Sequence, residues 1–548
     1  MDRYLIESLS EILHRLEQHL EDHGNEVVTT LQRVARGKLR MPETISPEEA
    51  EYARALFGQI AQVGPQHVCA TLQSALKNPA TLEGAFAFDN ILLELGIATN
   101  LPPLGELVNK RLQARIAVLL MSYLFYEEFH YPQPETGVYD ISGSSFQKLK
   151  WLYRYWFNQL EVAERGSGLE AFFASQSLDF CKEDECSPIP ENLPPVPFIS
   201  VSCAGDLLAV DVLTPQNTPH LFDEITDFYS TADIVSANLE STVDKNRPVG
   251  RTQRQGQPAQ MNTSEAMFQK FRDEAKINYF STATNHAMDW GEQGLLATLD
   301  VLKKSGAYHS GTAASQAEQD DVVVVEKDGI KVALLSYTFD LNGYKVPADK
   351  PYLANEVRFN DVEPPPDYSL IRKQVAAAKA KGAQWIIAYC HWGWEFEMYP
   401  HVNIVEAARK VIDCGVDTIL GNHAHVSQPA DLIPRPGQQD ALVIYAFGDF
   451  VSYHPESRNS KLAYAIKFNI GKLRGSVRLF GLEALPMYIV NEQRKDGSFN
   501  CRIVKFSDVM ENPDNYGLTD LEKHQLPHLH DKVWKDILSP ISSMPKWH

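Results

Sequence analysis

The sequence lacks a long hydrophobic run. Its longest apolar stretch, residues 116–126, is well short of the ~20 residues that a helix needs to cross a bilayer. The first 24 residues lack the apolar segment of a signal peptide; Leu9, Leu13, Leu16 and Leu20 instead recur at helical spacing. We therefore expect a packed N-terminal helix and no membrane partner.

Cysteine is scarce, and positive charge is in deficit. The seven cysteines are scattered and none is spaced as CxxC, which argues against a disulfide framework or a zinc knuckle and favours a reducing, cytoplasmic setting. Cys181 and Cys186, with Asp184, are close in sequence, but no second cluster supports a metal site there. The formal charge of −20 argues against general binding to nucleic acid or anionic membrane, because neutralising phosphates requires an excess of Lys and Arg.

The composition and hydrophobic pattern of the chain divide it into four parts. At 548 residues it is longer than single hydrophobic cores usually grow. Residues 1–180 have helical periodicity and predict a separate all-α domain, whose aromatic segment 146–163 suits a helix core better than a base-stacking surface. Residues 181–197 are rich in Pro and acidic residues, as a linker is. A catalytic domain over 198–510 and a polar helix and loop extension over 511–548 follow.

Short β-rich runs alternate with helical segments from Phe198 onward. The runs include residues 198–205, 233–240, 330–338, 384–392 and 416–421. Such alternation predicts an α/β fold in which sheet layers are flanked by helices. After Asp449 the pattern changes to that of antiparallel strands.

Polar residues fall repeatedly where these predicted strands end. Open α/β sheets build their sites at the carboxyl ends of strands, so these side chains are expected to converge. Alone, an Asp there is often a helix cap and a His is often a hydrogen-bonded core residue. Together, carboxylate, amide and imidazole groups suit a divalent ion such as Mn²⁺, Zn²⁺ or Fe²⁺. The residues are Asp206, Asn238, Glu240, Asn285, His286, Asp289, His391, His423 and His425.

Six sequence blocks follow one another from the first predicted strand onward: GD at Gly205, NLE at Asn238, TNHAMDWGEQGLLATLDVL at Thr284, HWGWEFEMYP at His391, GNHAHVSQP at Gly421 and YAFGDFV at Tyr445. In this order they resemble the blocks of the CapA family, which is associated with poly-γ-glutamate capsule production and is related to the calcineurin-like metallophosphoesterases. The resemblance covers residues 198–452 and implies a metallophosphoesterase-like layered sheet sandwich flanked by helices.

The resemblance also implies a role for each site residue. His286 would donate a proton to the leaving group, and Asp289 would orient His286. One departure concerns the first strand, where the wider phosphoesterase pattern has Asp-x-His and this chain has Leu208 as the third residue. We therefore expect one or two divalent ions, with the second position filled. The implied ligands are Asp206 and His425 for the first metal, Asn285, His391 and His423 for the second, and Glu240 as the bridge.

A basic loop follows the bridging glutamate. Arg247, Arg251 and Arg254 suit recognition of a carboxylate or phosphate, although a solvated polar loop has the same composition. Trp392, next to His391, is a further candidate for the substrate pocket, and packing would also explain it.

Three functions fit these residues. The first is a metal-dependent hydrolase acting on a small anionic, phosphoester-like substrate. The second is a CapA-like role in making or cleaving poly-γ-glutamate or a related γ-glutamyl amide. The third is a non-catalytic, metal-stabilised scaffold whose helical N-terminal region recruits partners.

Overall fold

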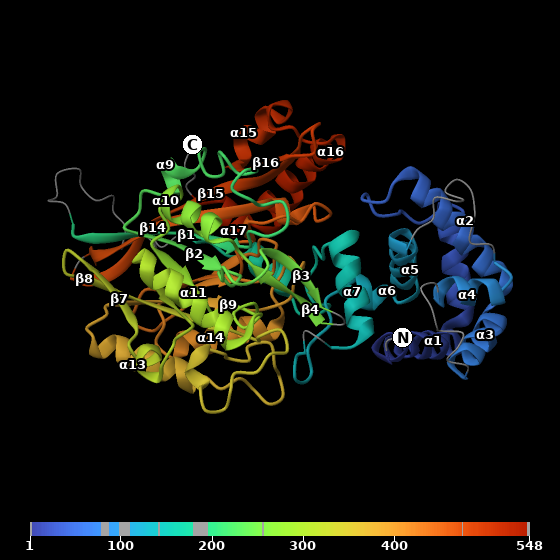
Figure 1. Ribbon diagram of the computed structural model, residues 1–548, viewed down its shortest axis with the longest axis horizontal. Coiled ribbons are helices and arrows are strands. Elements are labelled where there is room, and N and C mark those ends of the chain that lie inside the picture. The colour runs from blue at the N-terminus through green and yellow to red at the C-terminus, as the bar shows by residue number, and fades with distance from the viewer. Residues whose placement is uncertain are drawn as a thin grey trace. The chain divides into compact units, whose positions relative to one another are not determined.

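A computed structural model describes residues 3–77, 87–97, 110–140, 143–178, 196–254, 257–473 and 475–544. The chain divides into two compact units, Met1–Pro132 with Gly143–Leu160 and Gln133–Ser142 with Glu161–His548. Figure 1 colours the chain from its N-terminus to its C-terminus. In the described residues, no helix has the length and apolar character to span a bilayer.

The first unit is built from helices, as the periodicity predicts. Helix α2 shows why they form where they do: Ser46 caps its N-terminus, Pro47 occupies the first turn, and Glu49 completes a capping box. The helices are α1 (Arg3–Ala35), α2 (Pro47–Val63), α3 (Pro65–Lys77), α4 (Ala87–Glu94), α5 (Lys110–Leu124), α6 (Tyr126–His130) and α7 (Ser145–Trp156).

The aromatic segment of the first unit forms helix core. Phe146 and Tyr153 of α7 are buried, and both rings pack edge-on against Phe129. The Tyr153 hydroxyl also forms a 2.7 Å hydrogen bond with His130 Nε2. These two rings are therefore unavailable for stacking on bases.

The second unit contains two large sheets and a small hairpin. The first sheet has the order β16-β15-β14-β1-β2-β5-β6, with β13 also paired to β1; the second has the order β11-β12-β10-β9-β8-β7; β3 and β4 form the hairpin. The strands are β1 (Phe198–Leu207), β2 (Ile234–Leu239), β3 (Gly250–Arg254), β4 (Gln257–Asn262), β5 (Tyr279–Ser281), β6 (Tyr308–Ser310), β7 (Val323–Lys327), β8 (Ile330–Thr338), β9 (Trp385–His391), β10 (Thr418–Asn422), β11 (Ala430–Ile433), β12 (Ala441–Ile444), β13 (Asp449–Val451), β14 (Leu462–Leu473), β15 (Ser476–Gln493) and β16 (Phe499–Lys505).

Each large sheet contains a run of neighbouring parallel strands. β1, β2, β5 and β6 run parallel in the first, and β8, β9, β10 and β12 in the second. Strands β2, β9 and β10 are buried along their whole length, as strands covered on both faces should be. The antiparallel β14, β15 and β16 extend the first sheet, which agrees with the change of pattern after Asp449.

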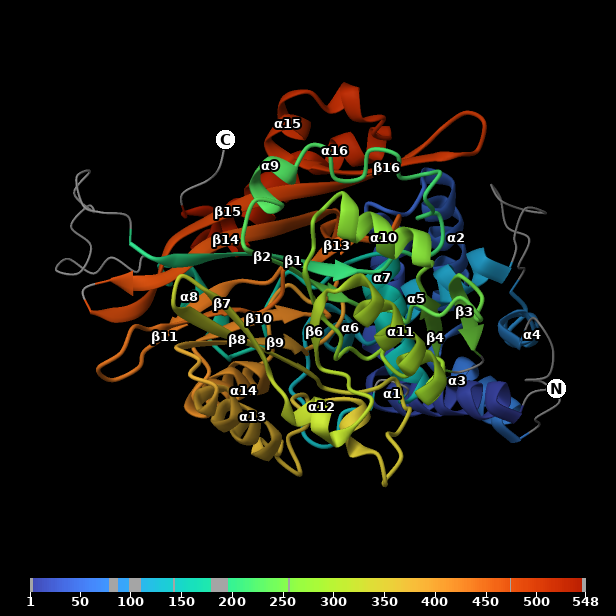
Figure 2. The same ribbon diagram turned by 60° about the vertical axis from the view of Figure 1, so that its left-hand side comes forward.

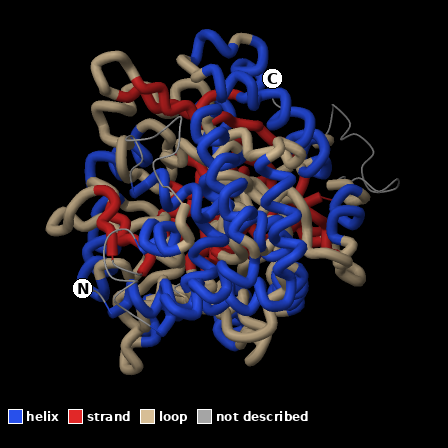
Figure 3. The backbone as a smooth tube through the Cα atoms, turned by 90° about the vertical axis from the view of Figure 1, so that its right-hand side faces the viewer, coloured by secondary structure: helices blue, strands red, loops and turns tan. Residues whose placement is uncertain are grey.

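Helices cover the sheets of the second unit, so the predicted layered α/β sandwich is confirmed. Figure 2 shows α13 and α14 on the side of the second sheet that faces away from the first. The strands, red in Figure 3, begin at residue 198 in the part of the chain that is described. The helical elements are α8 (Leu169–Ala174), α9 (Thr226–Tyr229), α10 (Glu265–Asp273), α11 (Gly291–Ser305), α12 (Gln316–Asp320), η3 (Pro351–Leu353), α13 (Ser369–Ala380), α14 (Val402–Asp413), η4 (Asn459–Lys461), α15 (Phe506–Glu511), η5 (Pro513–Tyr516), α16 (Asp520–His528), the π-helix η6 (Leu529–Ile537) and α17 (Ser539–Ser542).

Residues 161–178 belong to the second unit, whereas the sequence assigns them to the N-terminal helical part. The physical reason lies in two acidic side chains. Glu161 accepts hydrogen bonds from Asn459 and His528, and Glu164 accepts one from the backbone N–H of Val402. Most of the predicted linker 181–197, with Cys181 and Cys186, lies outside the described residues. The predicted domain boundaries stay a prediction.

Candidate metal centre

The ends of four parallel strands bring the predicted ligands together. Register pairs Asp206 of β1 with Asn238 of β2 in the first sheet, and His391 of β9 with Asn422 of β10 in the second. Asn238 then donates a 2.6 Å hydrogen bond to Asp206 and lies 3.1 Å from His391 Nδ1. The carboxyl ends of β1 and β2 in the first sheet and of β9 and β10 in the second therefore meet at one place.

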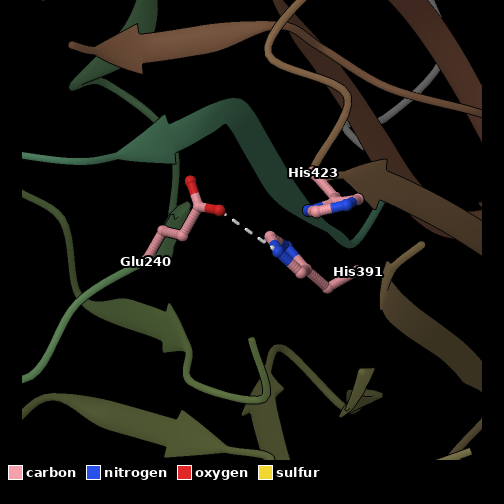
Figure 4. A group of neighbouring side chains, drawn as sticks. All are labelled: Glu240, His391 and His423. Atoms are coloured by element: carbon pink, nitrogen blue, oxygen red, sulfur yellow. Dashed lines mark ion pairs between the residues drawn. The ribbon is translucent and has the colours of Figure 1, made fainter. Parts of the chain in front are cut away.

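Glu240, His391 and His423 form the group predicted to hold the second metal. One ligand atom from each lies within 4.8 Å of the others, and all three side chains are buried. His391 Nε2 lies 3.3 Å from Glu240 Oε1, the contact drawn as a dashed line in Figure 4, which also shows His423 beside His391. The same nitrogen lies 2.8 Å from Asn285 Oδ1, so the amide predicted as a ligand lies beside this group.

Asp206, Glu240 and His425 form the group predicted for the first metal. Their ligand atoms also lie within 4.8 Å of one another, and His425 Nε2 lies 3.8 Å from Glu240 Oε1. Glu240 thus belongs to both groups, as a bridging carboxylate would. Asp206 accepts a 3.0 Å hydrogen bond from the backbone N–H of His423, which ties the two groups together.

Several buried ligand atoms have no hydrogen-bond partner in the described part of the chain. These are both carboxylate oxygens of Glu240 and both ring nitrogens of His423. A buried polar atom without a partner costs roughly 1–3 kcal/mol, and a charged one costs more. A divalent cation between these groups would satisfy them, so the residues present fit such an ion.

The electrostatics of the centre suit the same ion. Burial lowers the pKa of His391 and of His423 well below the usual value, and neighbouring imidazoles lower it further, so both rings are neutral at pH 7. Neutral imidazole is the form that binds metal. Burial, together with the charge of Asp206, raises the pKa of Glu240 well above its usual value. A cation would remove this repulsion between carboxylates.

The backbone at His423 and His425 is strained. His423 has φ of 98° and His425 has φ of 54°, conformations that residues other than glycine seldom adopt. Such conformations persist where the surrounding structure holds them, and they are frequent at functional sites. The turn directs both imidazoles toward Glu240.

His286 and Asp289 form a buried pair beside the ligands. His286 Nδ1 lies 2.7 Å from Asp289 Oδ2, and that oxygen also accepts a 2.6 Å hydrogen bond from the backbone N–H of Met261. Asn342, which the sequence did not single out, lies 3.2 Å from His286 Nδ1 and accepts a hydrogen bond from Asn285. The predicted pairing of His286 with Asp289 is therefore present.

The predicted arginines have intramolecular partners. Arg247 donates to Gln293, and Arg251 donates to Asp211 at 3.3 Å. Arg254 stacks over the ring of Tyr344, whose hydroxyl donates to the backbone carbonyl of Asp289. Arg254 is thus linked to the His286 pair, and its contact with substrate stays a prediction.

Trp392 is buried and has partners within the second unit. Its side chain is 1% exposed, its indole N–H donates to the backbone carbonyl of Tyr445, and its ring packs edge-on against Phe359. These contacts are those of a packing residue, and the contact of Trp392 with substrate stays a prediction.

Two residues of the centre were missed as site candidates. Asp449 begins β13, and His454 follows five residues after it. Asp449 accepts hydrogen bonds from His425 at 2.8 Å, with Nδ1 as donor, and from Ser452 at 2.6 Å. Asp449 lies inside the sixth sequence block and follows a buried strand, the signal that identified the other ligands.

Comparison with known proteins supports the sequence resemblance. Residues 200–454 match the family model described as bacterial capsule synthesis protein PGA_cap. The chain is 25% identical over 260 residues to the PGA biosynthesis protein CapA of Bacillus subtilis (strain 168), covering 46% of this chain and 63% of that protein. It is 24% identical over 263 residues to the capsule biosynthesis protein CapA of Bacillus anthracis, covering 46% and 59%. The chain therefore spans about three fifths of the length of these relatives.

Two solved structures show a distant likeness. A hypothetical protein from Thermus thermophilus aligns with a TM-score of 0.32 at 15% identity, covering 53% of this chain and 98% of that one. The calcineurin-like phosphoesterase YfkN from Bacillus subtilis aligns with a TM-score of 0.29 at 13% identity, covering 62% and 100%. At these scores neither likeness informs the function.

Proposed function

We propose that the unit carrying the PGA_cap match is a metal-dependent hydrolase that acts on a small anionic, phosphoester-like substrate. The observation that carries this proposal is the pair of buried ligand groups that share Glu240. A centre with a bridging carboxylate suits two cations close together, and such pairs serve displacement reactions at phosphorus.

The donor set suits Mn²⁺, Zn²⁺ or Fe²⁺, because carboxylate oxygens and imidazole nitrogens are mixed. Asp206, Glu240 and His425 would hold one ion, and Glu240, Asn285, His391 and His423 the other. Bound ions would lower the pKa of water, neutralise substrate oxygens and stabilise the charge that develops on displacement.

His286 holds the proton that the leaving group needs. Its Nδ1 faces Asp289, and this contact orients the ring. Nε2 is then the nitrogen that donates to the leaving oxygen. Asp289 is itself fixed by the Met261 N–H, so the ring's orientation is set by the chain.

A second candidate function is hydrolysis or formation of a γ-glutamyl amide. The family model and the names of the two Bacillus relatives favour it. The same residues would serve, with His286 donating its proton to a leaving amine instead of an oxygen. Arg254 would then pair with the substrate's free carboxylate rather than with a phosphate.

Turnover by purified protein saturated with Mn²⁺ tests these functions. The substrates are a nitrophenyl phosphodiester, a nitrophenyl phosphomonoester and a γ-glutamyl peptide. We expect turnover of at least one phosphoester, lost in His391→Ala and kept in His309→Ala, because His309 lies outside both ligand groups. Turnover of the peptide alone would favour the second function. Activity that survives in His391→Ala at wild-type level would refute catalysis at this centre.

A further inference from the structure

A tight turn after β8 lies beside the candidate metal centre. Its central residues, Asn342 and Gly343, both have positive φ, 52° and 77°. The backbone N–H of Tyr344 closes the turn with a 2.9 Å hydrogen bond to the carbonyl of Leu341. Positive φ at both central positions is typical of a type I′ turn, for which Asn-Gly is a favoured pair. The Asn-Gly pair therefore explains the backbone of this turn.

The turn alone does not explain the contacts of the Asn342 side chain. This side chain is 1% exposed, and its Oδ1 accepts a 3.2 Å hydrogen bond from Asn285 Nδ2. Its Nδ2 lies 3.2 Å from His286 Nδ1. The hairpin of β7 and β8 turns in the same way at Asp328, with φ of 52°, and Gly329, with φ of 76°, but there the first side chain is exposed. A turn of this kind thus forms in this chain without a buried side chain.

The contact with Asn342 decides which end of the Asn285 amide faces the second metal position. Asn285 Oδ1 lies 2.8 Å from Nε2 of the predicted ligand His391, while Nδ2 donates to Asn342. An amide binds a cation through its oxygen, because its NH₂ group only donates hydrogen bonds. The two ends of the amide have nearly the same shape, so hydrogen bonding selects the orientation. Asn342 therefore keeps the Asn285 oxygen on the side of the metal.

Tyr344, at the end of the same turn, contacts the partner of His286. Its hydroxyl donates a 2.8 Å hydrogen bond to the backbone carbonyl of Asp289 and accepts a 2.9 Å hydrogen bond from Gln260. One turn thus supports a predicted metal ligand through Asn342 and the residue that orients His286 through Tyr344.

We propose that Asn342 is a positioning residue for the second metal position, where it fixes the Asn285 amide with its oxygen toward the ion. The inference rests on the proposed function only in that the centre binds a divalent ion. Loss of a group that holds a metal ligand in place typically costs about 10–100-fold in metal affinity. Because Asn342 acts through Asn285, its loss should weaken binding of the second ion and leave binding of the first unchanged.

Calorimetric titration with Mn²⁺ tests the inference without substrate. Asn342→Gly removes the amide and keeps the turn, because glycine adopts positive φ readily. We expect this variant to bind the second ion about 10–100-fold more weakly than the wild-type protein. Asp328→Gly is the matched control: it makes a similar change at the same φ in an exposed turn, and it should bind both ions with wild-type affinity.

A conservative variant separates the amide contact from the turn. Asn342→Asp keeps an oxygen that accepts from Asn285 and a residue that tolerates positive φ, so it should bind the second ion with close to wild-type affinity. Asn342→Ala also removes the amide and gives the same loss as Asn342→Gly where glycine loosens the turn, which circular dichroism reports.

A double variant shows which ion Asn342 serves. His423→Ala takes a ligand from the second position and leaves the first ion bound. Adding Asn342→Gly to His423→Ala should not weaken the remaining ion further, because the effect of Asn342 passes through Asn285. Weaker binding of that ion in the double variant would overturn the assignment of Asn342 to the second position.

The remaining outcomes separate the inference from the proposed function. Wild-type affinity in Asn342→Gly and Asn342→Ala would overturn the inference and leave the function standing, because Asn342 would then serve only the turn. An equal loss in Asn342→Asp and Asn342→Gly would also overturn it. The expected loss in a protein that turns over no phosphoester or γ-glutamyl peptide would support the inference and refute the function. No bound metal in the wild-type protein would refute both.

Discussion

His391 and Glu240 come from different sheets, and His391 Nε2 lies 3.3 Å from Glu240 Oε1. His391 ends β9 of the second sheet, while Glu240 follows β2 of the first. A cation held between them would cross-link the two sheets. Metal binding should therefore stabilise the packing of the two sheets as well as serve catalysis, because the binding free energy adds to the free energy of folding.

Removing a ligand of the second metal position should remove metal. We expect His423→Ala and Asn285→Ala each to lose about one equivalent, since each takes a ligand from a group with few replacements. Elemental analysis of protein purified without chelator measures the loss. His309→Ala is the matched control. Wild-type metal content in both variants would refute the ligand assignment.

His286→Ala should separate chemistry from metal binding. If His286 protonates the leaving group, the variant keeps its metal and loses about 10²–10⁴-fold in turnover. The loss should be smaller for a nitrophenolate leaving group, which needs little help from a proton, than for an alkoxide. Equal losses for both would eliminate the acid role, and lost metal would make His286 a ligand.

Asp289→Asn should act through His286. The 2.7 Å contact holds the imidazole, so replacing the Asp289 carboxylate by a neutral amide should lower turnover by about 10-fold or more. The double variant His286→Ala/Asp289→Asn should be no slower than His286→Ala alone, because the two residues work as one unit. Multiplied losses in the double variant would show that Asp289 acts independently.

Part of the centre was predictable because parallel strands end at a common edge. Asp206, Glu240 and His391 each stand at such an end, and the structure brings all three together. The rule needs only hydrophobic runs and the residues that terminate them. The rule does not predict His454, whose position depends on the path of the chain after β13.

The basic loop was less predictable for a physical reason. Arginine side chains are long, and their partners depend on tertiary neighbours that the sequence does not reveal. Arg251 pairs with Asp211, which lies 40 positions away. The fold class was easier to predict from the sequence, because alternating buried strands and amphipathic helices have few ways to pack.

Glu161→Gln should destabilise the second unit in a pH-dependent way. Burial acts to raise the pKa of Glu161, but His528, Arg458 and Asn459 outweigh it and lower the pKa to about 2. A carboxyl with a depressed pKa stabilises the fold above its unfolded pKa of ~4.3, and this contribution is lost as the pH falls toward 2.

The expected loss in Glu161→Gln is about 1–3 kcal/mol at pH 7, diminishing below about pH 4.5. Urea unfolding monitored at several pH values measures it. Glu265→Gln, an exposed helix position, should change little at any pH. A penalty for Glu161→Gln that stays constant from pH 7 to pH 3 would contradict the ion-pair explanation.

Glu240→Gln should reverse its effect on stability with metal content. Without metal, the buried carboxylate lies among Asp206 and Asp449, and its pKa is raised by burial and by these charges. A carboxyl with a raised pKa destabilises the fold increasingly as the pH rises above its unfolded value, so the neutral amide should be more stable in chelator at pH 8 by roughly 1–3 kcal/mol. With saturating Mn²⁺ the wild-type protein should gain stability and the variant should gain less, because the bridging ligand is missing. Thermal unfolding in chelator and in Mn²⁺ measures both arms, with Glu265→Gln as the control. A variant that is less stable than the wild-type protein in chelator would show that Glu240 is held by partners other than a metal.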